Sequence, residues 1–114
     1  MNNADKGKIG EIRAKSLLEE KGHTILSTNF RSRRGEIDII SFLEGKVFFW
    51  EIKAWNQKID YHPLEIFHET KKRKMRKEAE RYLNIHPAFN HLTLSFGLAH
   101  SIPNQEVVFY SDLF

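Results

Sequence analysis

The stretch that decides the fold of this chain is Gly35–Lys53, which reads GEIDIISFLEGKVFFWEIK. Its two halves are rich in Ile, Phe, Val and Trp, and this composition predicts β-strands over 35–42 and 47–55. The segment between them, Leu43-Glu44-Gly45-Lys46, contains a glycine that can take the positive φ of a tight turn. The stretch is therefore predicted to form a β-hairpin.

This hairpin would place four charged residues on one face. With a two-residue turn, or with the four-residue loop, Asp38 lies opposite Glu51, and Glu36 lies opposite Lys53. Because successive side chains of a strand point to opposite faces, these four share a face, whereas a loop of odd length would separate Asp38 from Glu51. The opposite face is predicted to carry the apolar side chains Ile37, Ile39, Phe48, Trp50 and Ile52.

The two opposed carboxylates need a positive charge beside them. The Cβ atoms of directly opposed residues are about 5 Å apart, and at an effective dielectric constant of 20 two such charges repel by about 3 kcal/mol. A hard divalent cation offsets this repulsion, because Mg²⁺ prefers carboxylate, water and phosphate oxygens. We therefore expect Asp38 and Glu51 to bind Mg²⁺ or Mn²⁺, with Lys53 next to the ion. The alternative is a solvated strand face, on which Glu-x-Lys is common.

The remaining segments complete an α/β order. The predicted elements are, in chain order, a helix over 6–21, strands over 23–30, 35–42 and 47–55, a helix over 64–83, and strands over 92–99 and 106–110. The apolar stripe of the first helix consists of Gly7, Ala14, Leu17 and Leu18. Glu11 falls within this stripe, either as an accessory acid of the metal site or as a border residue paired with Lys15.

Composition limits the class of protein. The 114 residues, 40% hydrophobic and 29% charged, suit one globular domain spanning 1–114, with 1–5 expected to be flexible. The sequence has no cysteine, which excludes disulfides, thiolate metal sites and a cysteine nucleophile. The six histidines lack metal-ligand spacing and are expected at the surface or in loops. A polar start and no long apolar run predict a cytoplasmic protein without a membrane partner.

Positive charge is concentrated in two segments. Lys71–Arg81 holds seven basic and two acidic residues, although the net charge of the chain is only +3, and three arginines precede the hairpin. Such surfaces bind phosphate backbones with a salt-dependent affinity. The alternative is a solvated helix face, partly neutralised by Lys74-Glu78 and Arg76-Glu80 pairs. The candidate nucleic-acid-binding residues are Arg31, Arg33, Arg34, Lys71, Arg73, Lys74, Lys77 and Arg81.

Asp38 followed by Glu51-Ile52-Lys53 resembles the PD-(D/E)xK signature of restriction-endonuclease-like nucleases. Along almost its whole length the chain is similar to the YraN-like family of small bacterial nuclease-like proteins, which resembles archaeal Holliday junction resolvases. The matching motifs are Gly7-x-x-Gly10-Glu11, Asn29-Phe30-Arg31, Gly35-Glu36-Ile37-Asp38, Glu51-Ile52-Lys53 and Tyr82-Leu83 within the basic helix. The resemblance implies a restriction-endonuclease-like core, a mixed sheet flanked by helices in the order αβββαββ.

The resemblance also implies roles and an activity. Asp38 and Glu51 would bind the metal, Lys53 would be the catalytic lysine, Glu11 would be the acid of the first helix, and Glu36 would be an accessory residue. The implied function is a Mg²⁺-dependent endonuclease acting on DNA, with branched or recombination-type structures among its substrates and a homodimer as its assembly. Two other hypotheses stay open, namely a non-catalytic nucleic-acid-binding protein that keeps the fold and a protein-interaction module with a basic helix.

Overall fold

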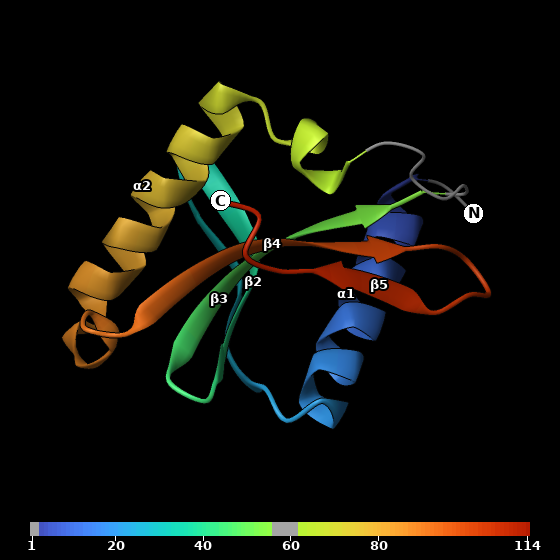
Figure 1. Cartoon of the computed structure of the whole chain (residues 1–114). Helices are drawn as coiled ribbons and strands as arrows, with labels where there is room; N and C mark the ends of the chain where they lie inside the picture. The colour runs from blue at the N-terminus through green and yellow to red at the C-terminus, as the bar shows by residue number, and fades with distance from the viewer. Residues whose placement is uncertain (1–2, 56–61) are drawn as a thin grey trace.

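The computed structural model describes residues 3–55 and 62–114, which form a five-stranded mixed sheet flanked by two helices (Figure 1). The helices and strands are α1 (Asn3–Glu20), β1 (Thr24–Ser32), β2 (Gly35–Leu43), β3 (Lys46–Ala54), α2 (Glu69–Ile85), β4 (Thr93–Ser101) and β5 (Val107–Tyr110). The strands lie in chain order, with β3 and β4 parallel and all other neighbours antiparallel. The predicted order αβββαββ is confirmed, and it is compatible with a restriction-endonuclease-like core.

The hairpin forms where the sequence predicts it. Glu44 and Gly45 have φ angles of 49° and 80°, which are the two positive φ values of a two-residue hairpin turn. The pairing runs from Leu43 with Lys46 to Ile39 with Trp50, and this is the predicted register. Beyond that pair β3 continues to pair with β4 as far as Ala54. The β2 and β3 ladder therefore ends one residue before Asp38, so the predicted pairs of Asp38 with Glu51 and of Glu36 with Lys53 do not belong to it.

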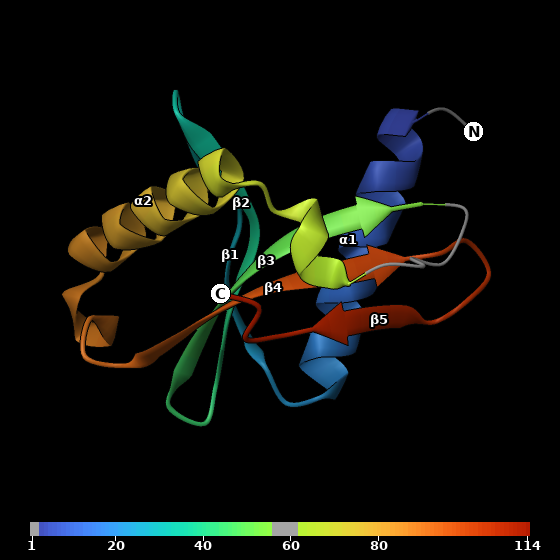
Figure 2. The same cartoon turned by 45° about the horizontal axis from the view of Figure 1, so that its top comes forward.

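The sheet is covered on both faces, which differs from the single apolar face predicted for the hairpin. Along β3 the side chains alternate, so that Phe48 and Trp50 pack with Ala14 and Leu18 of α1, whereas Phe49 packs in the cluster beneath α2. Figure 2 shows the two helices on different sides of the strands. The prediction failed because a strand buried on both faces shows no hydrophobic alternation.

The faces also change along β2. Ile39 shares the α1 cluster with Phe48 and Trp50, as expected of residues predicted on one face, but Ile37 packs in the α2 cluster. Asp38 lies between these two residues of β2. On β1, Thr28 pairs with Ile39 and Phe30 pairs with Ile37. Asn29 lies between Thr28 and Phe30 and has a φ of 53°. This local change of backbone turns the end of the β1 and β2 ribbon toward α2.

Both helices differ from their predicted bounds. The second predicted helix, 64–83, is a 3-10 turn over Pro63–Ile66 followed by α2, because Phe67 is extended and inserts its ring into the core. The first helix begins at Asn3, earlier than predicted. Gly7 of its predicted stripe is exposed, and Gly10, outside that stripe, packs against Ala54.

Neither helix, over the residues described, is long and apolar enough to cross a membrane. The loop predicted after β3 falls mostly on 56–61, outside the described residues.

Gly97 is the residue of β4 that tolerates no side chain. A Cβ atom there would lie 2.6 Å from Trp50 Cζ3 and 2.6 Å from the Tyr110 carbonyl oxygen. We expect Gly97→Ala to lower the free energy of unfolding by about 1–3 kcal/mol in urea titrations. Gly7→Ala is the matched control, because a Cβ at Gly7 meets nothing within 4 Å. Equal midpoints for Gly97→Ala and the wild type would contradict this packing.

Candidate active site

Asp38 takes over a backbone hydrogen bond where β2 and β3 separate. Ile52 N–H donates to Asp38 Oδ2 at 2.8 Å, so the side chain replaces the ladder partner that β2 no longer supplies. The hydrogen bond fixes the carboxyl group against β3, directly beside Glu51. The sequence prediction that the hairpin brings Asp38 and Glu51 together agrees with this arrangement.

The surroundings of Asp38 oppose its ionisation. Burial, and then the negative charge of Glu51, raise the pKa of Asp38 to about 8, and a hydrogen bond with the Glu51 side chain and the charge of Glu36 act in the same direction. The hydrogen bond from Ile52 lowers the pKa but is outweighed. A cation bound beside this carboxyl group would lower its pKa and favour the ionised form.

Glu51 already has a cation beside it. Lys71 Nζ lies 2.6 Å from Glu51 Oε2, and the Glu51 side chain is only 10% exposed. Lys71 belongs to the first turn of α2, so this ion pair joins the basic helix to the acidic pair on the sheet. The sequence assigned Lys71 to nucleic-acid binding, whereas the structure places its ammonium group on a candidate metal ligand.

Lys53 follows Glu51 by two positions on β3 and therefore lies on the same side of the strand. Among the described residues it takes part in no ion pair. Its neighbour on β4 is His100, which is 1% exposed and packs against the ring of Trp55. The prediction that the histidines lie at the surface or in loops is wrong for His100, because the alternation of β4 alone does not show that both of its faces are covered.

Glu11 lies on the other helix and bonds to β1. Asn29 Nδ2 donates to Glu11 Oε1 at 2.8 Å, and Asn29 stands opposite Asp38 in the ribbon of β1 and β2. The charges that act on Asp38 are those of Glu51 and Glu36. The structure thus places Glu51 and Glu36 near enough for their charges to act on Asp38, whereas the Glu11 side chain bonds to Asn29 of β1. Within the described ranges Glu11 forms no ion pair with Lys15.

The donor set fits one hard cation. No group of three or more His, Asp or Glu side chains with metal-binding geometry occurs in residues 3–55 and 62–114. Asp38 and Glu51 supply two carboxylates, which matches the one or two that Mg²⁺ takes from protein while water and phosphate complete its shell. The raised pKa of Asp38 and the ammonium group on Glu51 both indicate a place where positive charge is favoured.

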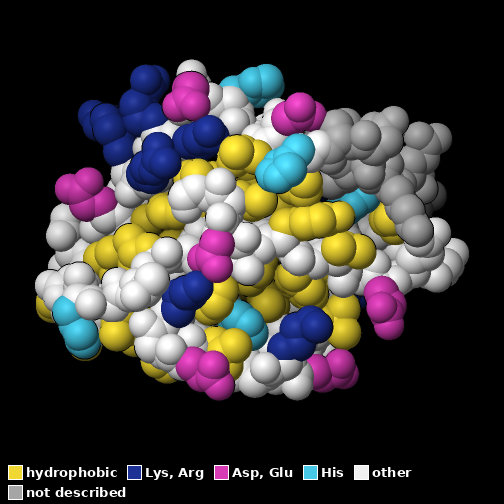
Figure 3. Space-filling model, in the orientation of Figure 1, with side chains coloured by type: hydrophobic (Ala, Val, Ile, Leu, Met, Phe, Trp, Pro, Cys, Tyr) yellow, Lys and Arg dark blue, Asp and Glu magenta, His cyan; other side chains and the backbone are white. Residues whose placement is uncertain are grey.

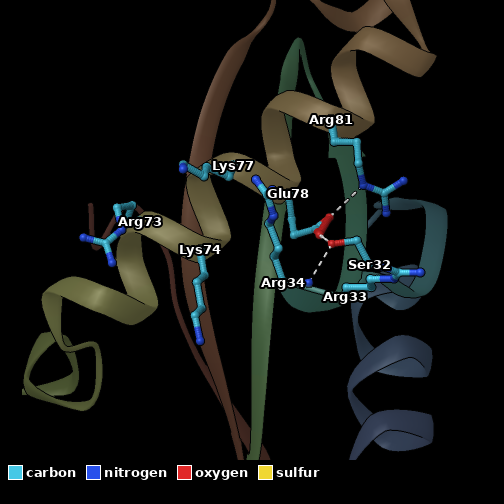
Figure 4. Close-up of a pocket in the computed structure, with 8 residues that line it drawn as sticks. All are labelled: Ser32, Arg33, Arg34, Arg73, Lys74, Lys77, Glu78 and Arg81. Carbon is cyan, nitrogen blue, oxygen red and sulfur yellow. Dashed lines mark hydrogen bonds and ion pairs between the residues drawn. The ribbon is translucent and has the colours of Figure 1, made fainter.

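A groove lined by basic residues lies between the β1–β2 turn and α2 (Figure 4). We call it the basic groove; it has a volume of about 490 Å³. Figure 3 shows Lys and Arg side chains gathered over the region of α2. The residues that line the basic groove are Ser32, Arg33, Arg34, Arg73, Lys74, Lys77, Glu78 and Arg81. Of the predicted nucleic-acid-binding residues, six line the groove, while Lys71 and Arg31 do not.

The groove is held together by a buried acid that the sequence prediction missed. Glu78 is 3% exposed, bonds to Ser32 Oγ, and accepts a hydrogen bond from Arg81 Nε at 3.0 Å. Arg81 also donates to the Arg31 carbonyl oxygen and lies over the Phe30 ring. Arg81 therefore attaches α2 to β1 while it also lines the groove, and its role as a phosphate contact stays a prediction. The Lys74-Glu78 pair of the alternative interpretation is replaced by an ion pair between Glu78 and Arg81. The sequence does indicate that Glu78 is buried, because position 78 falls in the buried stripe of Met75, Ala79 and Tyr82.

The fold and these side chains define an α/β protein that is compatible with a restriction-endonuclease-like core and has two neighbouring carboxyl groups and a basic groove. The model of a family described as "Uncharacterised protein family UPF0102" matches residues 10–102. The chain is 36% identical over 109 residues to a UPF0102 protein of Leptospira interrogans, covering 96% of this chain and 94% of that protein. It is 38% identical over 84 residues to a UPF0102 protein of Chlorobium phaeobacteroides, covering 74% and 67% respectively. The chain belongs to the UPF0102 family, so the YraN-like resemblance is confirmed.

Proposed function

We propose that this protein is a Mg²⁺-dependent nuclease that hydrolyses phosphodiester bonds in DNA. The observation that carries the proposal is that the Ile52 N–H holds the Asp38 carboxyl group against β3, where the charge of Glu51 raises its pKa. Lys53 lies on the same side of β3 as Glu51, and the basic groove lies between the β1–β2 turn and α2. Burial and mutual repulsion make it unfavourable for both carboxyl groups to be ionised in the metal-free protein. A bound divalent cation would offset this cost.

The roles of the side chains follow from their positions. When Mg²⁺ is bound, the chemistry it supplies is polarisation of a phosphoryl oxygen. Asp38 and Glu51 hold the cation, and the Lys53 ammonium group stabilises the negative charge that develops on the phosphate. Water forms the new bond to phosphorus while the bond to the leaving sugar oxygen breaks. The water loses a proton to solvent and the sugar oxygen gains one, which leaves a phosphomonoester and an alcohol.

The ion pair between Lys71 and Glu51 supports a second candidate function. An ammonium group on a candidate metal ligand is also what a non-catalytic nucleic-acid-binding protein with the nuclease fold would show. Such a protein would bind DNA equally well with metal or with chelator, whereas a nuclease would need the metal to cut.

The test is a cleavage assay with labelled single-stranded, duplex, nicked and four-way-branched DNA in Mg²⁺, Mn²⁺ or EDTA. We expect the wild type to cut at least one substrate in the presence of metal only. Glu51→Gln should be at least about 100-fold slower, because it removes the charge of one ligand. Glu19→Gln, an exposed glutamate of α1, is the matched control. Binding without cleavage would favour the second candidate, and equal rates for wild type and Glu51→Gln would remove the nuclease proposal.

A further inference from the structure

The basic groove carries positive charge that the acidic residues of the described ranges do not neutralise. Its free cations are Arg33, Arg34, Arg73, Lys74 and Lys77, all of which are exposed. None of the ion pairs formed among the described residues uses any of these five. The acid in the lining, Glu78, is engaged by Ser32 and Arg81. The ligand that suits the groove is therefore an anion.

The cations are spread along the groove rather than directed at one point. Arg73, Lys74 and Lys77 follow α2 over four residues, a rise of about 6 Å. Arg33 and Arg34 line the groove from the β1–β2 turn, and Figure 4 shows the Arg34 side chain extending toward α2. Successive phosphates of a nucleic-acid strand match such a row better than a single small anion does, and contacts of this kind are independent of base sequence.

The groove is also preformed. Ser32 and Glu78 connect the β1–β2 turn to α2, Arg81 bonds from α2 back to the Arg31 carbonyl oxygen, and the Arg34 N–H donates to Ser32 Oγ. The two walls are thus held at a fixed separation before any ligand arrives. A preformed site avoids part of the ordering cost of binding.

Two structural connections place the groove close to the acidic pair. On α2, Lys71 contacts Glu51 and Lys74 of the groove follows three residues later, a rise of about 4.5 Å. On β2, Gly35 lies beneath Lys74 and Glu78, and Asp38 follows three residues later, about 10 Å along the strand. Each strand of duplex DNA carries one phosphate per about 3.4 Å of helix axis, so a span of about 10 Å along that axis corresponds to roughly three nucleotides.

From this placement we infer that the basic groove binds the backbone of the strand being cut, two to three nucleotides from the scissile phosphate. This inference rests on the proposed nuclease function and adds a requirement to the substrate. Cleavage needs charged backbone phosphates on the groove side of the cut, and strands that end sooner are poor substrates.

Binding without cleavage tests the groove first. Affinity for a fluorescein-labelled 20-base-pair duplex is measured by anisotropy in EDTA at several salt concentrations. We expect Arg34→Gln/Lys77→Gln to bind roughly tenfold more weakly and to reduce the slope of log affinity against log salt by about 2. Lys8→Gln/Lys15→Gln, two exposed lysines of α1, is the matched control and should match the wild type. An unchanged salt slope for the groove variant would overturn the inference.

The position of the groove is tested on a DNA that the wild type cuts at a mapped bond. Single methylphosphonates, which are uncharged, replace the phosphates one at a time on either side of that bond. We expect roughly tenfold slower cleavage when the phosphate two or three nucleotides away on one side is neutral. The groove variant should be insensitive to that same replacement. A wild-type rate that is unaffected at these positions would overturn the assignment. If the salt slope falls as expected but no DNA is cut, the phosphate site stands and the nuclease proposal fails.

Discussion

Asp38→Asn should eliminate metal-dependent cleavage and, in the metal-free protein, raise stability at pH 8. The amide oxygen of asparagine can still accept the Ile52 N–H, so the junction of β2 and β3 is retained. The variant lacks the charge that would hold Mg²⁺, and a loss of about 4 kcal/mol of charge stabilisation corresponds to a rate roughly 10³-fold lower. Loss of activity together with gain of stability is the pattern expected of a site that is unfavourable without its ligand.

The pH dependence of this effect has a definite sign. The folded-state pKa of Asp38, about 8, is above its unfolded value, with burial as the main cause and Glu51 as the second. The folded state therefore holds the proton more tightly, and its contribution to stability is complete below about pH 4 and is lost as the pH rises toward 8. In EDTA the melting temperature of Asp38→Asn should exceed that of the wild type at pH 8, and the two should converge toward pH 4.

Asp112 provides a control of opposite sign. A hydrogen bond with Ser95 and the neighbouring Lys46 lower the pKa of Asp112, so its contribution to stability is present above its unfolded pKa and is lost in stronger acid. Asp112→Asn should therefore be less stable than the wild type at pH 8.

Mn²⁺ should raise the melting temperature of the wild type and of Asp112→Asn, but not that of Asp38→Asn. Equal metal-induced shifts in all three proteins would contradict the assignment of Asp38 as a ligand.

The acidic pair could be predicted from sequence because its causes are local. Two positive φ angles at Glu44-Gly45 fix the turn, and the turn fixes the register as far as Ile39 with Trp50. Asp38 is the next residue of β2, and its side chain accepts the Ile52 N–H beside Glu51. Alternation alone could not show that Ile37 would turn to the α2 side, since that change depends on the separation of β2 from β3 and on the backbone of Asn29.

The contacts of α2 were beyond the reach of local patterns. A charged helix face predicts cations in solvent, and four basic residues of α2 line the groove. The sequence does not reveal which cations are already engaged, because the partners lie far along the chain. Lys71 meets Glu51 of β3, and Arg81 meets the Arg31 backbone. The position of Glu78 in the helix indicates that it is buried, but its partner Ser32, at the end of β1, could not be identified from local sequence.

Lys53→Met should reduce the cleavage rate by roughly 10²- to 10³-fold, which is the usual cost of removing one group that stabilises developing charge. The ammonium group of Lys53 forms no ion pair with the described residues, so it is available to a phosphate beside Glu51. Methionine keeps most of the length and volume of the side chain. Turnover at saturating DNA and the Mn²⁺-induced rise in melting temperature are measured together.

Lys71→Met is the informative comparison, because Lys71 belongs to the same cluster but its ammonium group is engaged with Glu51 at 2.6 Å. Removing that partner leaves Glu51 open, so Lys71→Met should change the Mn²⁺ concentration needed for half-maximal stabilisation. Lys53→Met should leave that concentration unchanged and lower the turnover rate alone. A wild-type turnover rate in Lys53→Met would exclude Lys53 from the chemistry. A lost response to Mn²⁺ in the same variant would show that Lys53 maintains the metal site rather than acting on the phosphate.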